Sequence, residues 1–207
     1  MDIIIKKYKI NNITVNVVRD DLLPFGTKQR SLIEFLGKQK FQEYIYVSPP
    51  NGMGQLALAQ CSKIINKKVT IFTPLKKNKH KITKTISKLS NVTLKEINVN
   101  KFSELYEHAT KYLDNIKEKK GKNYIHMFDL GFFDKKFIDI MAKNIKSNWN
   151  ESFNIKRMWV TGGSGTLLNV LYKVFPKTHF ILVQVGHKIS EEYIKPRRTT
   201  VLTPPQK

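Results

Sequence analysis

Residues 158–175 read MWVTGGSGTLLNVLYKVF: a short apolar run, a turn of glycines and hydroxyl residues, and an apolar segment with helical spacing. Glycines let the backbone adopt positive φ angles and approach an anion closely, while the free N–H groups and the positive dipole end of the following helix face the ligand. We therefore expect a phosphate group to be bound by the turn, whose residues are Thr161, Gly162, Gly163, Ser164, Gly165 and Thr166. The same arrangement binds the phosphate groups of nucleotides, phosphosugars and pyridoxal phosphate. A tight connection without a ligand is the alternative.

Strand-like and helix-like segments alternate through most of the chain. The expected strands are residues 13–18, 44–48, 69–73, 92–97, 124–128, 156–160 and 179–185. The expected helices are residues 29–38, 54–65, 79–89, 101–119, 135–149 and 167–175. This alternation predicts an α/β fold with parallel sheets, right-handed crossovers and helices on both faces. Ligands of such sheets bind at the carboxyl ends of the strands, which is where the glycine turn lies.

Composition narrows the class of protein. The chain has 207 residues, 41% of them hydrophobic, and lacks both an apolar run long enough to cross a bilayer and the pattern of a secretory signal. We expect a cytoplasmic protein, or one of the host-cell cytoplasm if it is viral. The single cysteine, Cys61, fits a reducing compartment. No residue spacing indicates a metal site.

The net charge of +21 points to a polyanionic partner. Nucleic acid would be attracted through contacts with its phosphates and through counterion release. The basic run KKNKHK at residues 76–81 is either a solvated surface or such a phosphate contact. Compositional bias of an AT-rich coding sequence is the alternative source of the lysines.

A second motif lies near the N-terminus, where residues 19–36 read RDDLLPFGTKQRSLIEFL. After the turn at residues 24–26 a helix is predicted, with Lys28 in its first turn. The positive helix end and the nearby Arg30 both disfavour the ammonium form, so the pKa of Lys28 should be lowered. A neutral lysine amine is a nucleophile that can form a Schiff base with an aldehyde.

Three segments together resemble fold-type II pyridoxal-phosphate enzymes, particularly the aminocyclopropane-carboxylate deaminase and D-cysteine desulfhydrase group. They are residues 19–36, the segment SPPNGMGQLA at residues 48–57, and the glycine turn at 161–166. The resemblance implies that Lys28 holds pyridoxal 5'-phosphate covalently and that Asn51 hydrogen-bonds the hydroxyl of its ring. Gln55 matches the helix glutamine that follows, and the turn of residues 161–166 would bind the cofactor phosphate.

The chain also departs from this family. Pro50 and Gly52 replace the serine and the histidine or glutamine that usually flank the asparagine, and the sequence is shortened after residues 184–186. The resemblance implies two lobes, with a cofactor-anchoring lobe at 1–41 and 144–190, a smaller lobe at 42–143, and a loosely held basic tail at 191–207. A partner chain, such as a second copy in a homodimer, could supply the missing part of the site.

These features predict a lyase or deaminase-like enzyme acting on an amine or an amino acid. The positive net charge suggests that the substrate amine is carried on a nucleic acid, as in the enzymatic modification of bases. Two alternatives stay open: a non-catalytic descendant that binds nucleic acid through its basic surface, and a nucleotide or phosphoribosyl transferase on a doubly wound sheet. We expect Asp129 and Asp134 to belong to a loop and a helix start, and His126 to lie in the core.

Overall fold

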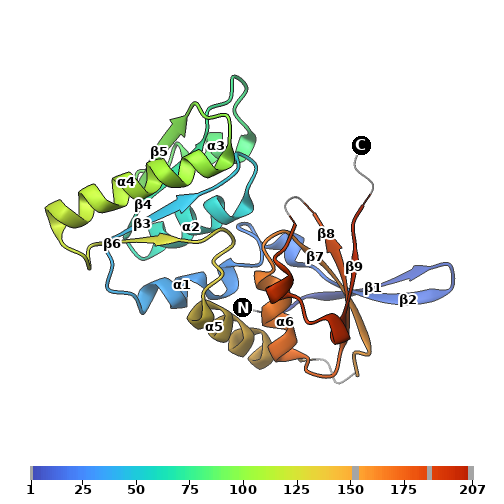
Figure 1. The fold of residues 1–207 in the computed structure, drawn as a ribbon. Coiled ribbons are helices and arrows are strands. Elements are labelled where there is room, and N and C mark those ends of the chain that lie inside the picture. Colours follow the sequence, from blue (N-terminus) through green and yellow to red (C-terminus); the bar gives the residue numbers. More distant parts are fainter. Residues whose placement is uncertain (1, 151–153, 186–187, 205–207) are drawn as a thin grey trace. The chain divides into compact units, whose positions relative to one another are not determined.

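The computed structural model describes residues 2–150, 154–185 and 188–204 and divides into two compact units (Figure 1). Unit 1 comprises Met1–Asp20 and Phe133–Lys207, and unit 2 comprises Asp21–Phe132. This division differs from the expected lobes at residues 21–41 and 133–143. Residues 21–41 contain helix α1 (Gln29–Gly37), which packs on α2 (Met53–Ile64) of unit 2. Residues 133–143 open helix α5 (Lys135–Ser147), which packs on α6 (Thr166–Val174) of unit 1.

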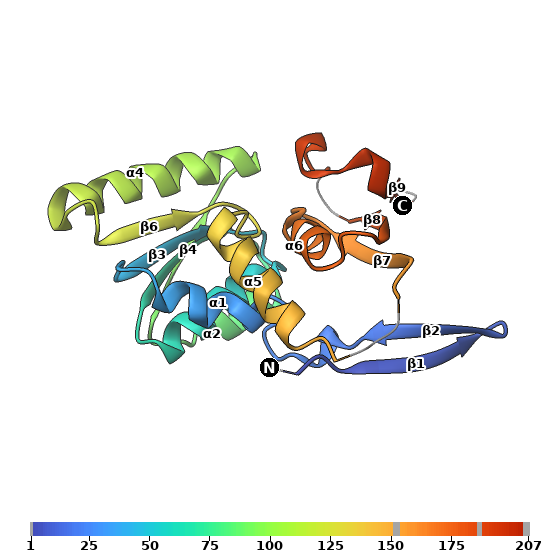
Figure 2. The same cartoon turned by 90° about the horizontal axis from the view of Figure 1, so that it is seen from below.

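Unit 2 is built on a four-stranded parallel sheet of order β5-β4-β3-β6. Its strands are β3 (Glu43–Val47), β4 (Lys68–Pro74), β5 (Val92–Ile97) and β6 (Ile125–Phe128). Its remaining helices are α3 (Lys81–Ile86) and α4 (Phe102–Lys120), and the short 3-10 helix η1 (Asp20–Leu22) begins at the last residue of unit 1. Figure 2 shows α4 on one face of this sheet and α1 and α2 on the other. Every residue of β3 is buried, as expected for a central parallel strand covered on both faces.

The carboxyl ends of these strands bring three loops to one edge of the unit 2 sheet. Residues 48–52 follow β3, residues 75–80 follow its neighbour β4, and residues 129–132 follow β6. In the last of these loops the backbone N–H of Gly131 donates to the hydroxyl of Tyr46, whose ring stacks on that of Phe132. Parallel α/β sheets bind their ligands at this edge, so these loops are where a site in unit 2 is expected.

Unit 1 contains a hairpin and a second parallel sheet. Strands β1 (Ile5–Ile10) and β2 (Ile13–Val18) pair antiparallel, so the prediction that residues 13–18 belong to a parallel sheet was wrong. Asn11 and Asn12 both have positive φ, the backbone of the tight turn that joins such strands. The parallel sheet has the order β7-β8-β9, with β7 (Arg157–Gly162), β8 (His179–Gln184) and β9 (Thr199–Leu202).

The basic tail is not a loose extension over the residues that the structure describes. It forms two short 3-10 helices, η2 (Glu191–Tyr193) and η3 (Pro196–Arg198), and then β9, which adds a third strand to the sheet of unit 1. The guanidinium of Arg198 donates to the carbonyl oxygen of Phe175 at 2.6 Å. The hydroxyls of Tyr172 and Thr199 are hydrogen-bonded to each other. Residues 205–207 of the predicted tail lie outside the described residues.

Helices of the described residues include none with the length and apolar character needed to cross a membrane.

Candidate functional site

Lys28 stands at the N-cap of α1, directly after a turn closed by Gly26. Gly26 has φ +75°, its N–H donates to the carbonyl of Leu23, and the carbonyl of Lys28 accepts the N–H of Leu32 at 3.0 Å. The helix is fixed by its buried side, which includes Leu32, Phe35 and Leu36. Lys28 therefore begins a helix whose position is set by core packing.

The amine of Lys28 is desolvated, and this burial lowers its pKa from the usual 10.5. The lowered pKa was expected from the positive helix end and from Arg30. Its cause is instead the burial of the amine. A lowered pKa increases the fraction of the amine that is neutral at a given pH, and the neutral amine is the nucleophilic form. Lys28 thus has the electrostatics of a nucleophilic lysine.

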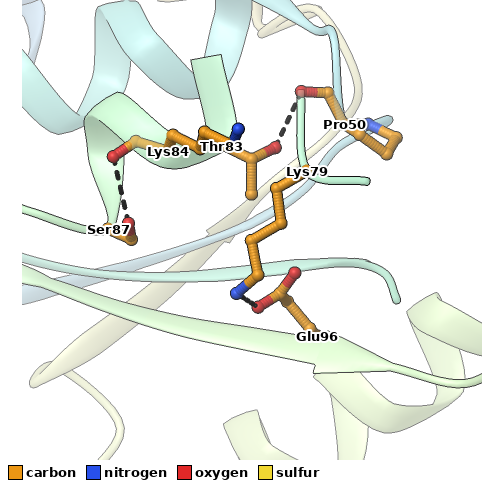
Figure 3. Close-up of polar contacts among 6 residues, drawn as sticks. All are labelled: Pro50, Lys79, Thr83, Lys84, Ser87 and Glu96. Atoms are coloured by element: carbon orange, nitrogen blue, oxygen red, sulfur yellow. Dashed lines mark hydrogen bonds and ion pairs between the residues drawn. The ribbon is translucent and has the colours of Figure 1, made fainter. Parts of the chain in front are cut away.

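Asn51 lies in the loop between β3 and α2, and its side chain is exposed. The backbone of this loop is held by two side chains. The Nε2 of Gln55 donates to the carbonyls of Pro49 and Pro50, both at 3.0 Å. The hydroxyl of Thr83 on α3 donates to the same Pro50 carbonyl at 2.9 Å (Figure 3). These three hydrogen bonds to two neighbouring carbonyls fix the backbone that presents Asn51.

Two details bear on how this loop departs from the family it resembles. A Cβ on Gly52 would clash with the hydroxyl oxygen of Ser48 and come within 3.2 Å of the Pro49 carbonyl oxygen, so a larger residue at position 52 requires these atoms to shift. Among the described residues, the Oε1 atom of the fully buried Gln55 has no hydrogen-bond partner, an uncommon state for a buried acceptor. The loop is therefore closely packed at Gly52 and is supported by a glutamine whose Oε1 is unpaired among those residues.

Lys28 and Asn51 belong to neighbouring pieces of unit 2. Helices α1 and α2 pack against each other, and each of the two residues lies at or just before the N-terminus of its helix. A Cβ on Gly26, in the turn before α1, would come within 3.6 Å of the terminal methyl of Met53, the first residue of α2. The turn before α1 therefore lies close to the start of α2. The structure thus places the start of the Lys28 helix near the start of α2, which follows Asn51.

The six residues of the glycine turn span the end of β7 and the start of α6 in unit 1. Thr161 and Gly162 are the last residues of β7, and Gly162 pairs with Gln184 of β8. Of the three glycines only Gly165 has positive φ, at +79°, and it is the N-cap of α6. Gly162 serves packing instead, because a Cβ there would lie 2.7 Å from the Leu182 side chain.

This turn fits an anionic group. Because Gly165 has no side chain, the N-cap residue cannot cap the first-turn N–H groups of α6, and these lie at the positive end of the helix dipole. The hydroxyls of Ser164 and Thr166 are 3.2 Å apart beside them. Asn169 supports the turn, since its Nδ2 donates to the carbonyls of Gly165 and Tyr193 at 3.1 and 2.9 Å. Backbone donors with neighbouring hydroxyls suit a phosphate.

The remaining sequence candidates have structural roles. The carboxylate of Asp134 caps α5 by accepting the N–H of Phe137 at 2.9 Å, and Asp129 lies in the loop after β6, as expected. The ring of His126 stacks on Phe41 at 4.9 Å and is half-buried. Among the described residues, no group of three or more His, Cys, Asp and Glu side chains could hold a metal ion.

Two supporting residues escaped sequence reasoning. Thr83 lies 33 positions from Pro50 in the chain, so only the packing of α3 on α2 reveals its hydrogen bond. Asn169 was read as part of an apolar helix, although a polar residue three positions after a helix start was the available signal. Both residues hold a loop through its backbone carbonyls.

Comparison with known proteins found no match among protein-family models and none among curated proteins. Solved structures do match. A homologue of ACC deaminase superposes with a TM-score of 0.72 at 15% identity, over 90% of this chain and 61% of its own. A hydrogen sulfide-producing enzyme from Fusobacterium nucleatum gives a TM-score of 0.67 at 12% identity, over 97% of this chain and 69% of its own.

A third match is a pyridoxal 5'-phosphate-dependent aspartate racemase, with a TM-score of 0.58 at 15% identity, over 82% of this chain and 51% of its own. The chain thus spans about three fifths of the length of the ACC deaminase homologue and half that of the racemase. The predicted α/β architecture is confirmed. The chain has the fold of the fold-type II pyridoxal-phosphate enzymes, over part of their length.

Proposed function

We propose that the protein is a pyridoxal-phosphate-dependent enzyme that acts on the amino group of an amine or an amino acid, with lyase or deaminase chemistry. The observation that carries this proposal is the desolvated Lys28, whose lowered pKa makes a nucleophilic amine available at the start of α1. The motif around Lys28 and the likeness of the fold to enzymes of this kind support it.

Different residues of the chain would bind the cofactor and transfer the proton. The turn of residues 161–166 would hold the cofactor phosphate by backbone N–H groups and hydroxyls, and Asn51 would hydrogen-bond the ring oxygen. Bound pyridoxal phosphate supplies a ring that stabilises negative charge on the substrate carbon next to the amino group. Lys28, with its Nζ able to be neutral or protonated, would accept and return the proton of that carbon.

We further propose that the substrate amine is carried on a nucleic acid. The net charge of +21 supports this extension, because such an excess far exceeds what solubility needs and attracts phosphate backbones.

The absorption spectrum tests the enzyme proposal. Purified protein titrated with pyridoxal phosphate should develop the visible band of a lysine-bound cofactor, and a Lys28→Ala variant should lose that band. Lys40→Ala is the matched control, because Lys40 is an exposed lysine just beyond the other end of α1. Loss of the band in both variants, or in neither, would contradict the assignment of Lys28.

The second candidate is a non-catalytic protein that retains the fold and binds nucleic acid. The close packing around Gly52 favours it, because a histidine or glutamine at position 52 would require the Ser48 hydroxyl and the Pro49 carbonyl to shift. Absence of a cofactor band together with salt-sensitive retention of nucleic acid would support this candidate.

A further inference from the structure

Helix α3 lies in a stretch of the chain with a large excess of positive charge. Residues 75–95 contain seven lysines and no acidic residue: Lys76, Lys77, Lys79, Lys81, Lys84, Lys88 and Lys95. Helix α3 buries Ile82, Thr83 and Ile86 against its unit. Lys81 and Lys84 of α3 and Lys88, which lies in the turn after its end, are exposed and follow at intervals of three and four positions. We call these three residues the α3 lysine face.

The charges of this face are uncompensated. Lys79, at the start of the stretch, is paired with Glu96 of β5 (Figure 3), whereas the described residues include no ion-pair partner for the three lysines of the face. Helix α4 differs, since its lysines alternate with Glu104, Glu107, Asp114 and Glu118. The α3 lysine face therefore keeps its positive potential, while that of α4 is largely neutralised locally.

The face is also tied to the edge of the sheet that carries Asn51. Strands β3 and β4 are neighbours, and the loops after them, residues 48–52 and 75–80, leave the same carboxyl edge. Thr83, on the buried side of α3, donates to the carbonyl of Pro50, the residue before Asn51. Helix α3 and the turn after it thus expose the lysines, while the buried side of the helix holds the Asn51 loop.

We propose that the α3 lysine face binds the phosphate backbone of a nucleic acid and so brings an attached amine to the edge that carries Asn51. The exposed positions of α3 are lysine and threonine, without large apolar side chains, which suits a partner recognised by regularly spaced charge. The delivery of an amine rests on the proposed function, whereas the binding of the backbone does not.

Fluorescence anisotropy with a labelled 20-base-pair DNA duplex at 50–200 mM NaCl tests the proposal. The variant K81Q/K84Q/K88Q removes the face, and K111Q/K119Q/K122Q is the matched control, which removes three exposed lysines on and after α4 and lowers the net charge equally. We expect the first variant to lower the magnitude of the salt slope by about 2–3, near 0.9 per lost phosphate contact, and to bind roughly tenfold more weakly. The control should keep the slope of the unmodified protein.

Equal losses in both variants would mean that binding follows total charge and would overturn the proposal, as would no loss in either. Displacement of the duplex by poly-glutamate at equal charge would favour an acidic polypeptide and overturn it as well. The Lys28→Ala variant separates this proposal from the enzyme proposal, since it should bind DNA like the unmodified protein. If the cofactor band is missing and the K81Q/K84Q/K88Q variant binds DNA more weakly, only the enzyme proposal is refuted. If the band is present and that variant binds DNA like the unmodified protein, only the proposal for the α3 lysine face is refuted.

Discussion

Lys28 shows how a single residue acquires its chemistry from burial. The chain has many lysines, but desolvation of its amine is what lowers the pKa of this one. Sequence reasoning found the residue and the direction of the shift from its neighbours. The physical cause could not be found that way, because desolvation depends on packing.

The lowered pKa gives a prediction on stability. In cofactor-free protein, the folded state loses the proton of Lys28 below the usual pKa of 10.5, so between the two pKa values the unfolded state binds more protons and stability rises with pH. A Lys28→Met variant lacks this penalty. We expect its free energy of unfolding in urea to exceed that of the unmodified protein at pH 7.5 and the difference to shrink toward pH 10.5. A difference that is constant with pH would contradict the desolvated amine.

Gly165 gives a second prediction at this scale. An alanine there must adopt φ +79° and would place its Cβ 3.0 Å from the Ile189 side chain, so Gly165→Ala should cost about 1–2 kcal/mol in urea unfolding. Gly37→Ala is the control, because nothing lies within 4 Å of its Cβ and it ends helix α1. That variant should be neutral or stabilising by about 0.5–1 kcal/mol. Similar losses in both would argue against the left-handed turn.

Among the elements, the alternating strands and helices could be predicted from the sequence, whereas strands β1 and β9 could not. Strands β3 to β8 and the helices between them carry strong apolar patterns, so their positions could be predicted from sequence. The hairpin partner of β2 was missed because its Asn11–Asn12 turn was not recognised. Strand β9 was missed because its four residues are too few to show the alternation of a strand. Only their pairing with β8 makes them a strand.

Strand β9 is tied to its unit through Tyr172, which gives a third prediction. The Tyr172 hydroxyl contacts Thr199 at the start of β9 and accepts the N–H of Lys195 at 3.0 Å. Tyr172→Phe should therefore cost about 1–2 kcal/mol and speed the hydrogen exchange of the β9 amides. The control is Tyr124→Phe, whose hydroxyl contacts the exposed Lys120. Unchanged exchange in β9 would show that Tyr172 does not anchor it.

For the molecule as a whole, the candidate residues are divided between the two units. Lys28 and Asn51 come from unit 2, and the turn of residues 161–166 comes from unit 1. The sequence motifs singled out these residues, and their roles stay predictions. The support that Thr83 provides could not be predicted, because its contact joins segments that only the fold brings together. For Asn169 the sequence offered only the signal of a polar residue near a helix start, and its contact with Tyr193 depends on the fold.

Cys61 reports on the integrity of unit 2. It is fully buried in α2, and burial raises its pKa to about 12. We expect iodoacetamide to leave it unmodified in the folded protein and to label it completely in urea, as read by intact mass. Labelling of Cys61 at the rate of a free thiol in the folded protein would contradict the packing of α2.

The covalent position of the cofactor tests the central claim most directly. Protein incubated with pyridoxal phosphate, reduced with borohydride and digested should carry the cofactor mass on the peptide that contains Lys28, at about one group per chain. Modification spread over surface lysines, with Lys28 unmodified, would contradict the proposed role of Lys28 and leave the basic surface as the basis for a function.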